Sequence, residues 1–342
     1  MLGKLFVFLL ITLFMLGACS DLLVTESEDN LNFADFEAAW SRVKEVYPYL
    51  EFKNIDWDSI YTVYRSRTEQ AKGDEFYLVL HALLFELRDG HVYYHTNGGG
   101  EVYPYVAPRH LKDRHSYSPF VVRKYFDREL RLTESGTVEY EVLPGNIGYI
   151  FLSDFHEDYL MKEFSNVLAY VRNTRGLIID IRQKRGGDLG NVIAVVSRFI
   201  SEPMPSVDIY WLGELASQPP IQPSGPFTYT NPVVVLINGS TFSAGEICTE
   251  MLKQLPQVTV VGDTTGGGSV ASSGSIPEFM GDYRLPSGKL IYIGTGDVRR
   301  YDGIPFEWLG IAPDIRVPQT AADIEAGRDK QLEFALNMLQ SL

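Results

Sequence analysis

Short apolar runs alternate with longer amphipathic stretches through much of the chain after Pro144. The apolar runs are typical of strands that are buried on both faces, and they cover residues 148–152, 176–182, 233–237 and 258–262. The stretches between them show helical periodicity, over residues 157–172, 191–200 and 244–255, and a last helix is expected over 321–339. This alternation predicts an α/β fold with a mainly parallel sheet.

The part of the chain before this alternation has a different pattern. Residues 31–90 are expected to be helical, because Phe36, Trp40, Val43 and Tyr47 recur at helical spacing and residues 76–87 form a second apolar helix. Residues 91–145 mix short aromatic and charged pieces with several glycines and prolines, and they predict a small β-rich segment with strands over 120–122 and 138–142. The expected organisation is therefore an N-terminal helical region (31–90), a β-rich segment (91–145) and a core with a C-terminal helix (146–342).

The first 18 residues have one early lysine, Lys4, and a long apolar run that ends in small residues, which predicts a signal peptide. Leu16-Gly-Ala-Cys19 resembles a bacterial lipobox, in which Cys19 is lipidated and anchors the mature protein to a membrane. The alternative is a plain secretory peptide with an incidental cysteine. Residues 19–30 are polar and acidic and predict a flexible tether.

Composition narrows the possible partners. The net charge of −14 becomes −15 when the signal peptide and its single lysine are removed (−14 − 1), which argues against binding to nucleic acid. With Cys19 lipidated, only Cys248 of the two cysteines remains, so no intrachain disulfide is expected and Cys248 is interpreted as a buried small hydrophobe. The six histidines are scattered, and the sequence predicts no metal site and no cofactor.

Ser243 lies where a strand ends, the chain turns and a helix begins. The unpaired N–H groups at a helix N-terminus carry partial positive charge, so a serine there can lie beside the anion site that acyl transfer requires. The alternative is structural, because Ser243-Ala-Gly-Glu246 also matches a capping box.

Two further places carry candidate chemistry. Gly90 suits the position after a helix, so His91 is expected on a turn, either as a general base or as a histidine with no catalytic role. Gly186-Gly187 is compatible with a structural turn, with a phosphate-binding loop that lacks the usual glycine and lysine pattern, or with an oxyanion hole.

Four segments occur in an order that is informative in itself: LIIDIRQKRGG (177–187), NGSTFSAGEI (238–247), VVGDTTGGGS (260–269) and FEWLGIAPDIRV (306–317). Together with GYIFLSDF (148–155), they resemble the tail-specific and tricorn-core serine peptidases, which include the C-terminal processing peptidases. The resemblance covers about residues 146–317, with Arg88-Asp-Gly-His91 upstream. It implies a ClpP/crotonase-like ββα superhelix, in agreement with the alternation described above.

The resemblance also implies roles for individual residues. Ser243 matches the nucleophile, His91 matches the histidine base of the tricorn branch, and Glu307 matches a glutamate that supports the catalytic network. The oxyanion hole is implied at Gly187, with Gly186 beside it, and at the N–H of Ala244. The branch that uses a lysine base carries it at the position of Gly268, and Lys253 is not expected to replace it.

Several positions depart from the family pattern. Gln183-Lys184-Arg185 replaces a turn that is usually rich in glycine and asparagine, and Phe242 is bulkier than the usual residue before the nucleophile. Lys184 and Arg185 either bind a substrate carboxylate or are solvated loop charges. Residues 91–145 are too few for a complete PDZ domain. The loop 263–270, with three successive glycines, is expected to be mobile and to line a cleft.

These observations predict an exported serine peptidase of the cell envelope that acts on a peptide or protein, with Ser243 as nucleophile and His91 as base. The alternative is a non-catalytic binding lipoprotein on the same fold, as in the related retinoid-binding proteins. A crotonase-type acyl-CoA enzyme is disfavoured by export. The oligomeric state does not follow from the sequence.

Overall fold

The computed structural model describes residues 28–153, 155, 160–183, 186–274 and 276–342. The expected signal peptide and Cys19 lie outside these residues, as do Lys184 and Arg185. Helix α2 begins at Glu28, so the end of the expected tether is helical. None of the helices described from residue 28 onward is long and apolar enough to cross a membrane.

The core is a seven-stranded sheet with the order β15-β10-β9-β6-β5-β4-β3. The four pairs from β15 to β5 are parallel, and the pairs β5–β4 and β4–β3 are antiparallel. This confirms the α/β fold with a mainly parallel sheet. The strands are β3 (Arg131–Leu132), β4 (Val138–Leu143), β5 (Ile147–Leu152), β6 (Gly176–Asp180), β9 (Val233–Ile237), β10 (Val258–Gly262) and β15 (Ile315–Arg316).

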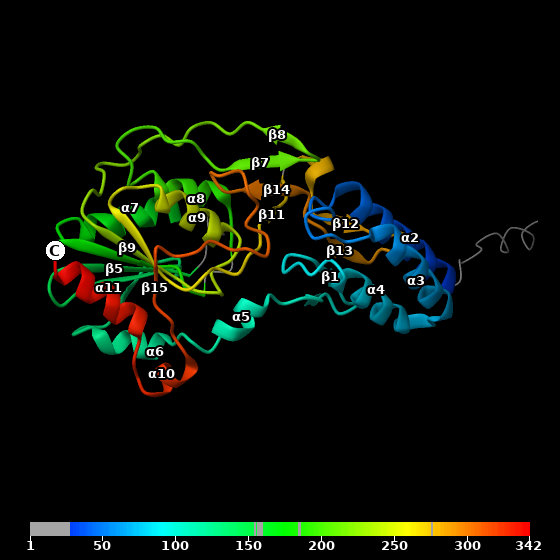
Figure 1. Ribbon diagram of the computed structural model, residues 1–342, viewed down its shortest axis with the longest axis horizontal. Coiled ribbons are helices and arrows are strands. Elements are labelled where there is room, and N and C mark those ends of the chain that lie inside the picture. The colour runs from blue at the N-terminus through cyan, green and yellow to red at the C-terminus, as the bar shows by residue number, and fades with distance from the viewer. Residues whose placement is uncertain (1–27, 154, 156–159, 184–185, 275) are drawn as a thin grey trace, which may run out of the picture.

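Helices cover both faces of this sheet (Figure 1). In β9, Val233, Val235 and Ile237 face a large apolar cluster formed with helices α7 (Leu160–Val171), α8 (Leu189–Val196) and α9 (Ala244–Lys253). Val234 and Leu236 of the same strand face the other side, where α11 (Lys330–Gln340) packs. Burial on both faces explains why this strand is a continuous apolar run in the sequence.

The C-terminal helix expected over 321–339 is two helices, α10 (Ala321–Glu325) and α11. Gly327, with φ of 75°, ends the first, and the side chain of Asp329 caps the second by accepting from the N–H of Leu332 at 2.9 Å. Glycine after a helix and aspartate before one are the usual stop and start signals, so the interruption was present in the sequence.

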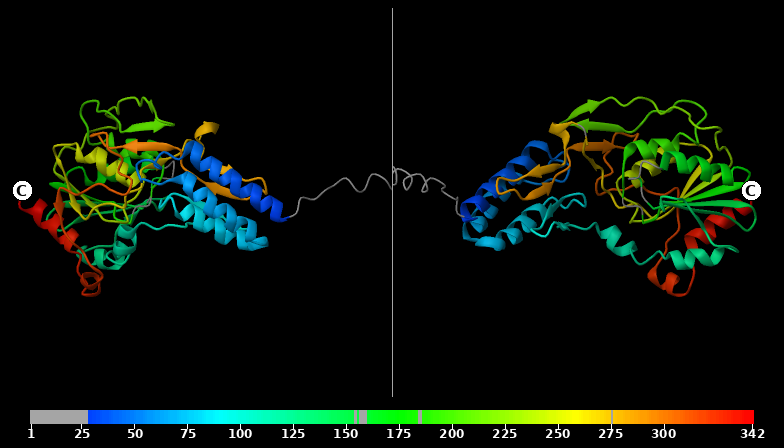
Figure 2. Two further views of the ribbon diagram at one scale, coloured as in Figure 1. Left: turned by 45° about the vertical axis from the view of Figure 1, so that its right-hand side comes forward. Right: turned by 180° about the vertical axis from the view of Figure 1, so that it is seen from behind.

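The N-terminal region contains the helices α2 (Glu28–Val46), α3 (Trp57–Gln70) and α4 (Phe76–Phe85), as expected. They pack on an antiparallel sheet of order β12-β13-β1-β2, in which two strands come from far along the chain. These strands are β1 (Tyr93–His95), β2 (Glu101–Val102), β12 (Asp282–Arg284) and β13 (Leu290–Tyr292). Figures 1 and 2 show this region at the opposite end of the molecule from α11.

Residues 91–145 do not form one β-rich unit. Their first strands join the N-terminal sheet, and β3 and β4 join the core sheet. Between them lie α5 (Pro108–Asp113) and α6 (Pro119–Val122). The strand expected over 120–122 was wrong, because Pro119 begins a helix there, and a short apolar run does not distinguish the two states.

A third sheet lies between the core and the N-terminal region, with the order β11-β14-β7-β8. Its strands are β7 (Asp208–Trp211), β8 (Glu214–Ala216), β11 (Val270–Ala271) and β14 (Gly296–Arg299). The buried hydroxyl of Tyr49 connects it to the N-terminal region, through Ser269 at 2.7 Å and Asp297 at 2.9 Å.

Candidate active site

Ser243 adopts a backbone conformation that side chains rarely adopt, with φ of 55° and ψ of −123°. It ends the serine turn, which we define as residues 238–243, between β9 and α9. The hydroxyl of Thr241 fixes this turn by donating to the carbonyl of Ile181 at 3.0 Å and accepting from the N–H of Asn238 at 3.1 Å. Residues in such conformations cost about 1–3 kcal/mol and cluster at functional sites.

Glu246 connects the serine turn to the glycine loop, residues 263–270. Its carboxylate accepts hydrogen bonds from the N–H groups of Ser243 (3.0 Å), Gly267 (2.8 Å) and Gly268 (2.8 Å), and from the hydroxyl of Thr265 (2.5 Å). Burial raises the pKa of Glu246 to about 7, against these four hydrogen bonds, which lower it. The residues from Thr265 to Val270 are buried. Hydrogen bonds to Glu246 and burial therefore anchor this loop, whereas the sequence had suggested that its three glycines leave it with few anchors.

The capping interpretation of Ser243 is met only in part. The N–H of Ser243 bonds to Glu246, as in a capping box. The Ser243 side chain lies near the N–H of Glu246 without a cap hydrogen bond, and that N–H donates to the Ser243 carbonyl at 2.8 Å. Glu246 thus stabilises this turn together with Thr241, and no hydrogen bond of the Ser243 hydroxyl to the helix start contributes.

Gly186 and Gly187 both have a φ near 140°, which favours glycine. A Cβ at Gly186 would lie 3.0 Å from Cβ and 3.2 Å from Oγ of Ser243, so this glycine packs against the serine. A Cβ at Gly187 would lie 2.4 Å from the main chain of Phe155. Gly186 thus lies beside Ser243 and the N–H of Ala244, and Gly187, the next residue, packs on Phe155.

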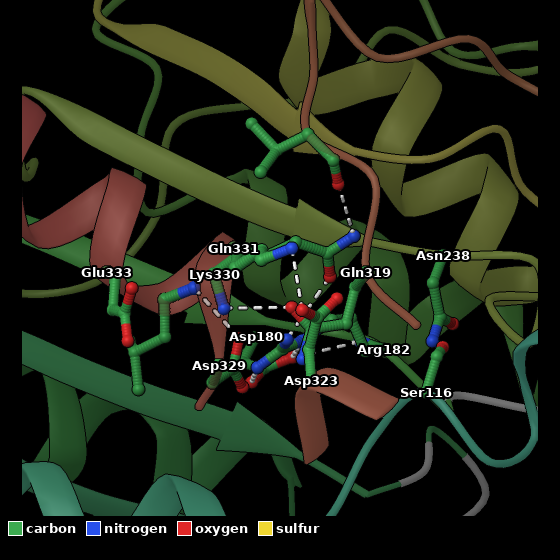
Figure 3. Close-up of polar contacts among 12 residues, drawn as sticks. Ser116, Asp180, Arg182, Asn238, Gln319, Asp323, Asp329, Lys330, Gln331 and Glu333 are labelled. Atoms are coloured by element: carbon green, nitrogen blue, oxygen red, sulfur yellow. Dashed lines mark hydrogen bonds and ion pairs between the residues drawn. The ribbon is translucent and has the colours of Figure 1, made fainter. Parts of the chain in front are cut away.

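A buried arginine stabilises the strand end that leads to these glycines (Figure 3). Arg182 is fully buried and pairs with Asp180 at 2.7 Å and with Asp329 at 2.8 Å. It also donates to the Gln331 side chain at 3.1 Å. These contacts join the start of α11 to the carboxyl end of β6, and Arg182 itself lies four residues before Gly186.

His91 lies beside the residue that precedes Ser243. Its ring stacks on the ring of Phe242, with centroids 4.5 Å apart. Both ring nitrogens are buried without a hydrogen-bond partner among the described residues, so His91 packs on the residue before Ser243 and is not hydrogen-bonded to Ser243. A Cβ at Gly268 would lie 2.1 Å from Phe242 and 2.8 Å from His91, which leaves no room for a lysine at this position.

Gly90 is not the left-handed residue after the preceding helix. Arg88, with φ of 45°, takes that conformation, and α4 already ends at Phe85. Gly90 instead allows close packing, since a Cβ there would lie 3.0 Å from the ring of Phe242.

A buried ion network lies behind His91, and we use that name for Tyr47, Lys53, Asp89 and Glu307. Lys53 is fully buried and lies 2.7 Å from the Glu307 carboxylate and 3.7 Å from that of Asp89. Tyr47 donates to Asp89 at 2.6 Å and accepts from Lys53 at 2.7 Å. Burial and the charge of Asp89 raise the pKa of Glu307 to about 7, against the opposing charge of Lys53.

Glu307 reaches the site indirectly. Its second carboxylate oxygen accepts from the N–H of Ser269 at 2.9 Å, and none of its hydrogen bonds or ion pairs in the described parts of the chain involves His91. Lys253 lies elsewhere, as expected, and bonds to the carbonyl of Ala312 and to Asp314.

Sequence reasoning missed Tyr47, Lys53 and Asp89. Asp89 lies two residues before the selected histidine, and this proximity in sequence was the available signal. Tyr47 was assigned to a helix face, and nothing marked Lys53. In the part of the chain that the structure describes, no three His, Cys, Asp or Glu residues are arranged to bind a metal ion.

Comparisons with known proteins agree with this architecture. The model of peptidase family S41 matches residues 146–317, and that of the tricorn protease C1 domain matches residues 34–85. The chain belongs to peptidase family S41.

Individual relatives share only part of their length with this chain. A carboxyl-terminal-processing protease of Synechocystis sp. is 29% identical over 202 residues, which are 57% of this chain and 44% of that protein. Tricorn protease homolog 1 of Streptomyces coelicolor is 27% identical over 245 residues, which are 70% of this chain and 20% of that protein. The chain thus spans less than half the length of these relatives.

One solved structure shares the fold over nearly the whole length of this chain. A Parabacteroides merdae protein, provisionally described as a peptidase, superposes with a TM-score of 0.76 at 26% identity. The match covers 90% of this chain and 96% of that protein.

Proposed function

We propose that this protein is a serine peptidase in which Ser243 is the nucleophile and His91 the general base. The observation that carries the proposal is the position of His91, stacked on Phe242 next to a strained Ser243, with neither ring nitrogen hydrogen-bonded in the described chain and Asp89 3.5 Å from Nδ1. A histidine with a purely structural role would be hydrogen-bonded when buried.

The reaction follows from these positions. Nε2 of His91 takes the hydroxyl proton as Oγ of Ser243 attacks the peptide carbonyl carbon, and the carbonyl oxygen becomes an oxyanion. The N–H groups of Gly187 and Ala244, with Gly186 beside them, stabilise that charge, a contribution of about 2.7–4 kcal/mol per donor in such sites. His91 then protonates the leaving amine. In the second half, water attacks the acyl-enzyme with His91 as base and releases Ser243.

The proposed reaction requires His91 to approach Ser243, because the two are not hydrogen-bonded in the described chain. Catalytic hydrogen bonds are often long without substrate and shorten in the complex. Phe242 lies against the imidazole ring and limits the directions in which it can turn, so the side chain that departs from the family pattern acts as a support for the base.

A phosphonate probe that reacts with activated serines tests the proposal. We expect the wild-type protein to be labelled at Ser243 and the variant Ser243→Ala to remain unlabelled with nearly the same thermal midpoint. Ser240→Ala is the matched control, since Ser240 is buried three residues upstream and should not affect labelling. An unlabelled wild-type protein would favour the non-catalytic binding alternative.

We further propose that the protein is exported and anchored to a membrane of the cell envelope through a lipid on Cys19, with residues 19–27 as tether. The support is the lipobox-like sequence before Cys19. Mass spectrometry of the native N-terminus tests this proposal, and an unmodified chain that begins at another residue would contradict it. Export would place the substrate, a peptide or protein, outside the cytoplasm.

A further inference from the structure

Asp89 contacts His91 in two ways. The main-chain N–H of His91 donates to Oδ1 of Asp89 at 2.8 Å, and the same oxygen lies 3.5 Å from Nδ1 of the imidazole. The first contact fixes the carboxylate relative to the His91 backbone. The second distance is slightly longer than a hydrogen bond, and it must shorten for Asp89 to accept the Nδ1 proton.

The other oxygen of Asp89 is fixed as well. Oδ2 accepts from the hydroxyl of Tyr47 at 2.6 Å and lies 3.7 Å from Nζ of Lys53. Lys53 is in turn fixed by the carbonyl of Leu87 at 2.9 Å. Burial opposes ionisation of Asp89, but the charge of Lys53 and the contacts of His91 and Tyr47 outweigh it and lower the pKa of this carboxyl well below its usual range. Asp89 is therefore a buried, ionised and oriented acceptor.

Glu307 lacks these properties with respect to His91. Its carboxylate bonds to Lys53 and to the Ser269 N–H. Its effect on the histidine must therefore pass through Lys53 and Asp89.

We propose that Asp89, and not Glu307, is the residue that positions His91: its carboxylate accepts the Nδ1 proton, so that Nε2 is unprotonated and available to Ser243. Glu307 acts one contact further away, by neutralising Lys53 together with Asp89. The inference rests on the proposed function, since it assigns the partner of the proposed base. It also gives the N-terminal region a role at the site, because the residues that follow α2 supply Tyr47 and Lys53.

The direct test is the tautomer of His91 in the wild-type protein. We expect ¹⁵N NMR of histidine-labelled protein, with the His91 signals assigned by their loss in His91→Gln, to show the neutral ring protonated at Nδ1. In Asp89→Asn we expect a large shift toward the Nε2–H form, because a neutral amide no longer favours a proton on Nδ1. Glu307→Gln is the comparison variant and should leave the tautomer as in the wild type.

The rate at which the phosphonate probe labels Ser243 measures how much Asp89 contributes to reactivity. Loss of the carboxylate that orients a catalytic histidine lowers the rate about 10⁴-fold in a serine protease with this arrangement, and we expect a fall of about 10³–10⁴-fold for Asp89→Asn. A wild-type ring protonated at Nε2, or an Asp89→Asn variant with unchanged tautomer and rate, would overturn the inference.

If Asp89→Asn does not fold, the tautomer of His91 in the wild-type protein still tests the inference, and Tyr47→Phe should lower the labelling rate by a smaller factor.

The peptidase proposal and the proposal for Asp89 can fail separately. An unlabelled wild-type protein whose His91 is protonated at Nδ1 defeats the peptidase proposal and leaves the role of Asp89 intact.

Discussion

The two sides of the candidate site are built by different physical means. The serine side is built from the main chain: a strained turn, two glycines with positive φ and N–H groups that bond to Glu246. The histidine side is built from buried charges, since Lys53 and two carboxylates lie behind His91 with almost no exposure to solvent. The difference shows that one reaction centre combines a part specified locally with a part specified by contacts across the chain.

Lys53→Met should produce the largest change in stability, because it removes the only cation of the buried ion network. Asp89 and Glu307 would then face each other in a buried site without a counter-charge. Breaking a buried pair by removing one partner costs about 3–5 kcal/mol, and we expect a loss of that order in the free energy of unfolding by urea.

Lys44→Met is the control for this variant. Lys44 pairs with Asp58 at 2.6 Å, but its side chain is 49% exposed and that of Asp58 is 68% exposed. Such exposed pairs contribute about 0–1 kcal/mol. Equal losses in the two variants would show that the buried charges are not what stabilises the histidine side.

The same contrast explains what the sequence predicted. Strands β9 and β10 have the predicted bounds, and the strand, turn and helix around Ser243 follow from local signals within about 20 residues. The ion network combines residues 47, 53, 89 and 307, and no periodicity or spacing connects them. Two local signals were overlooked, Pro119 at the start of α6 and Gly327 within the last helix. The β12–β13 hairpin also carries a turn signal, Pro286-Ser287-Gly288, but no local signal predicts that β13 pairs with β1.

Gly186→Ala tests the main-chain geometry on the serine side. The new Cβ would lie 3.0–3.2 Å from the Ser243 side chain and would disfavour the φ of 140°. Displacement of an oxyanion donor costs about 10²–10³-fold in rate, and we expect the rate of probe labelling to fall by that factor. Gly136→Ala is the matched control, because Gly136 also has a positive φ, 77°, with nothing within 4 Å of its added Cβ. Similar labelling rates in the two variants would count against the oxyanion role.

Glu246 and Asp89 should respond to pH in opposite directions. The folded state raises the pKa of Glu246 from 4.5 to about 7. Between these values the folded protein keeps a proton that the unfolded chain has lost, so the contribution of Glu246 to stability falls as the pH rises. The stability that Glu246 loses across this window is about 3 kcal/mol, at 1.36 kcal/mol per pKa unit. Asp89, with a lowered pKa, loses its contribution only as the pH falls below its unfolded value.

Glu246→Gln isolates the first of these effects, because glutamine imitates the protonated carboxyl. We expect the difference in the free energy of unfolding, wild type minus variant, to decrease from pH 4.5 to pH 7. A difference that is constant over this window would mean that the four hydrogen bonds to Glu246 balance its burial, and one that increases with pH would mean that they outweigh it.

Ser243→Gly compared with Ser243→Ala gives the smallest expected effect and isolates the strain at the serine turn. Both variants lack the hydroxyl and should remain unlabelled. Alanine retains the Cβ that disfavours a φ of 55°, whereas glycine adopts this conformation without strain. Relief of about 1–3 kcal/mol of strain is opposed by about 0.4–1 kcal/mol from the greater freedom of glycine in the unfolded chain. We therefore expect Ser243→Gly to be more stable than Ser243→Ala by about 1 kcal/mol in urea denaturation. The buried ion network is the same in both variants and does not contribute to this difference. If alanine is the more stable of the two, the turn is not strained, and the main chain on the serine side is then as relaxed as an ordinary helix start.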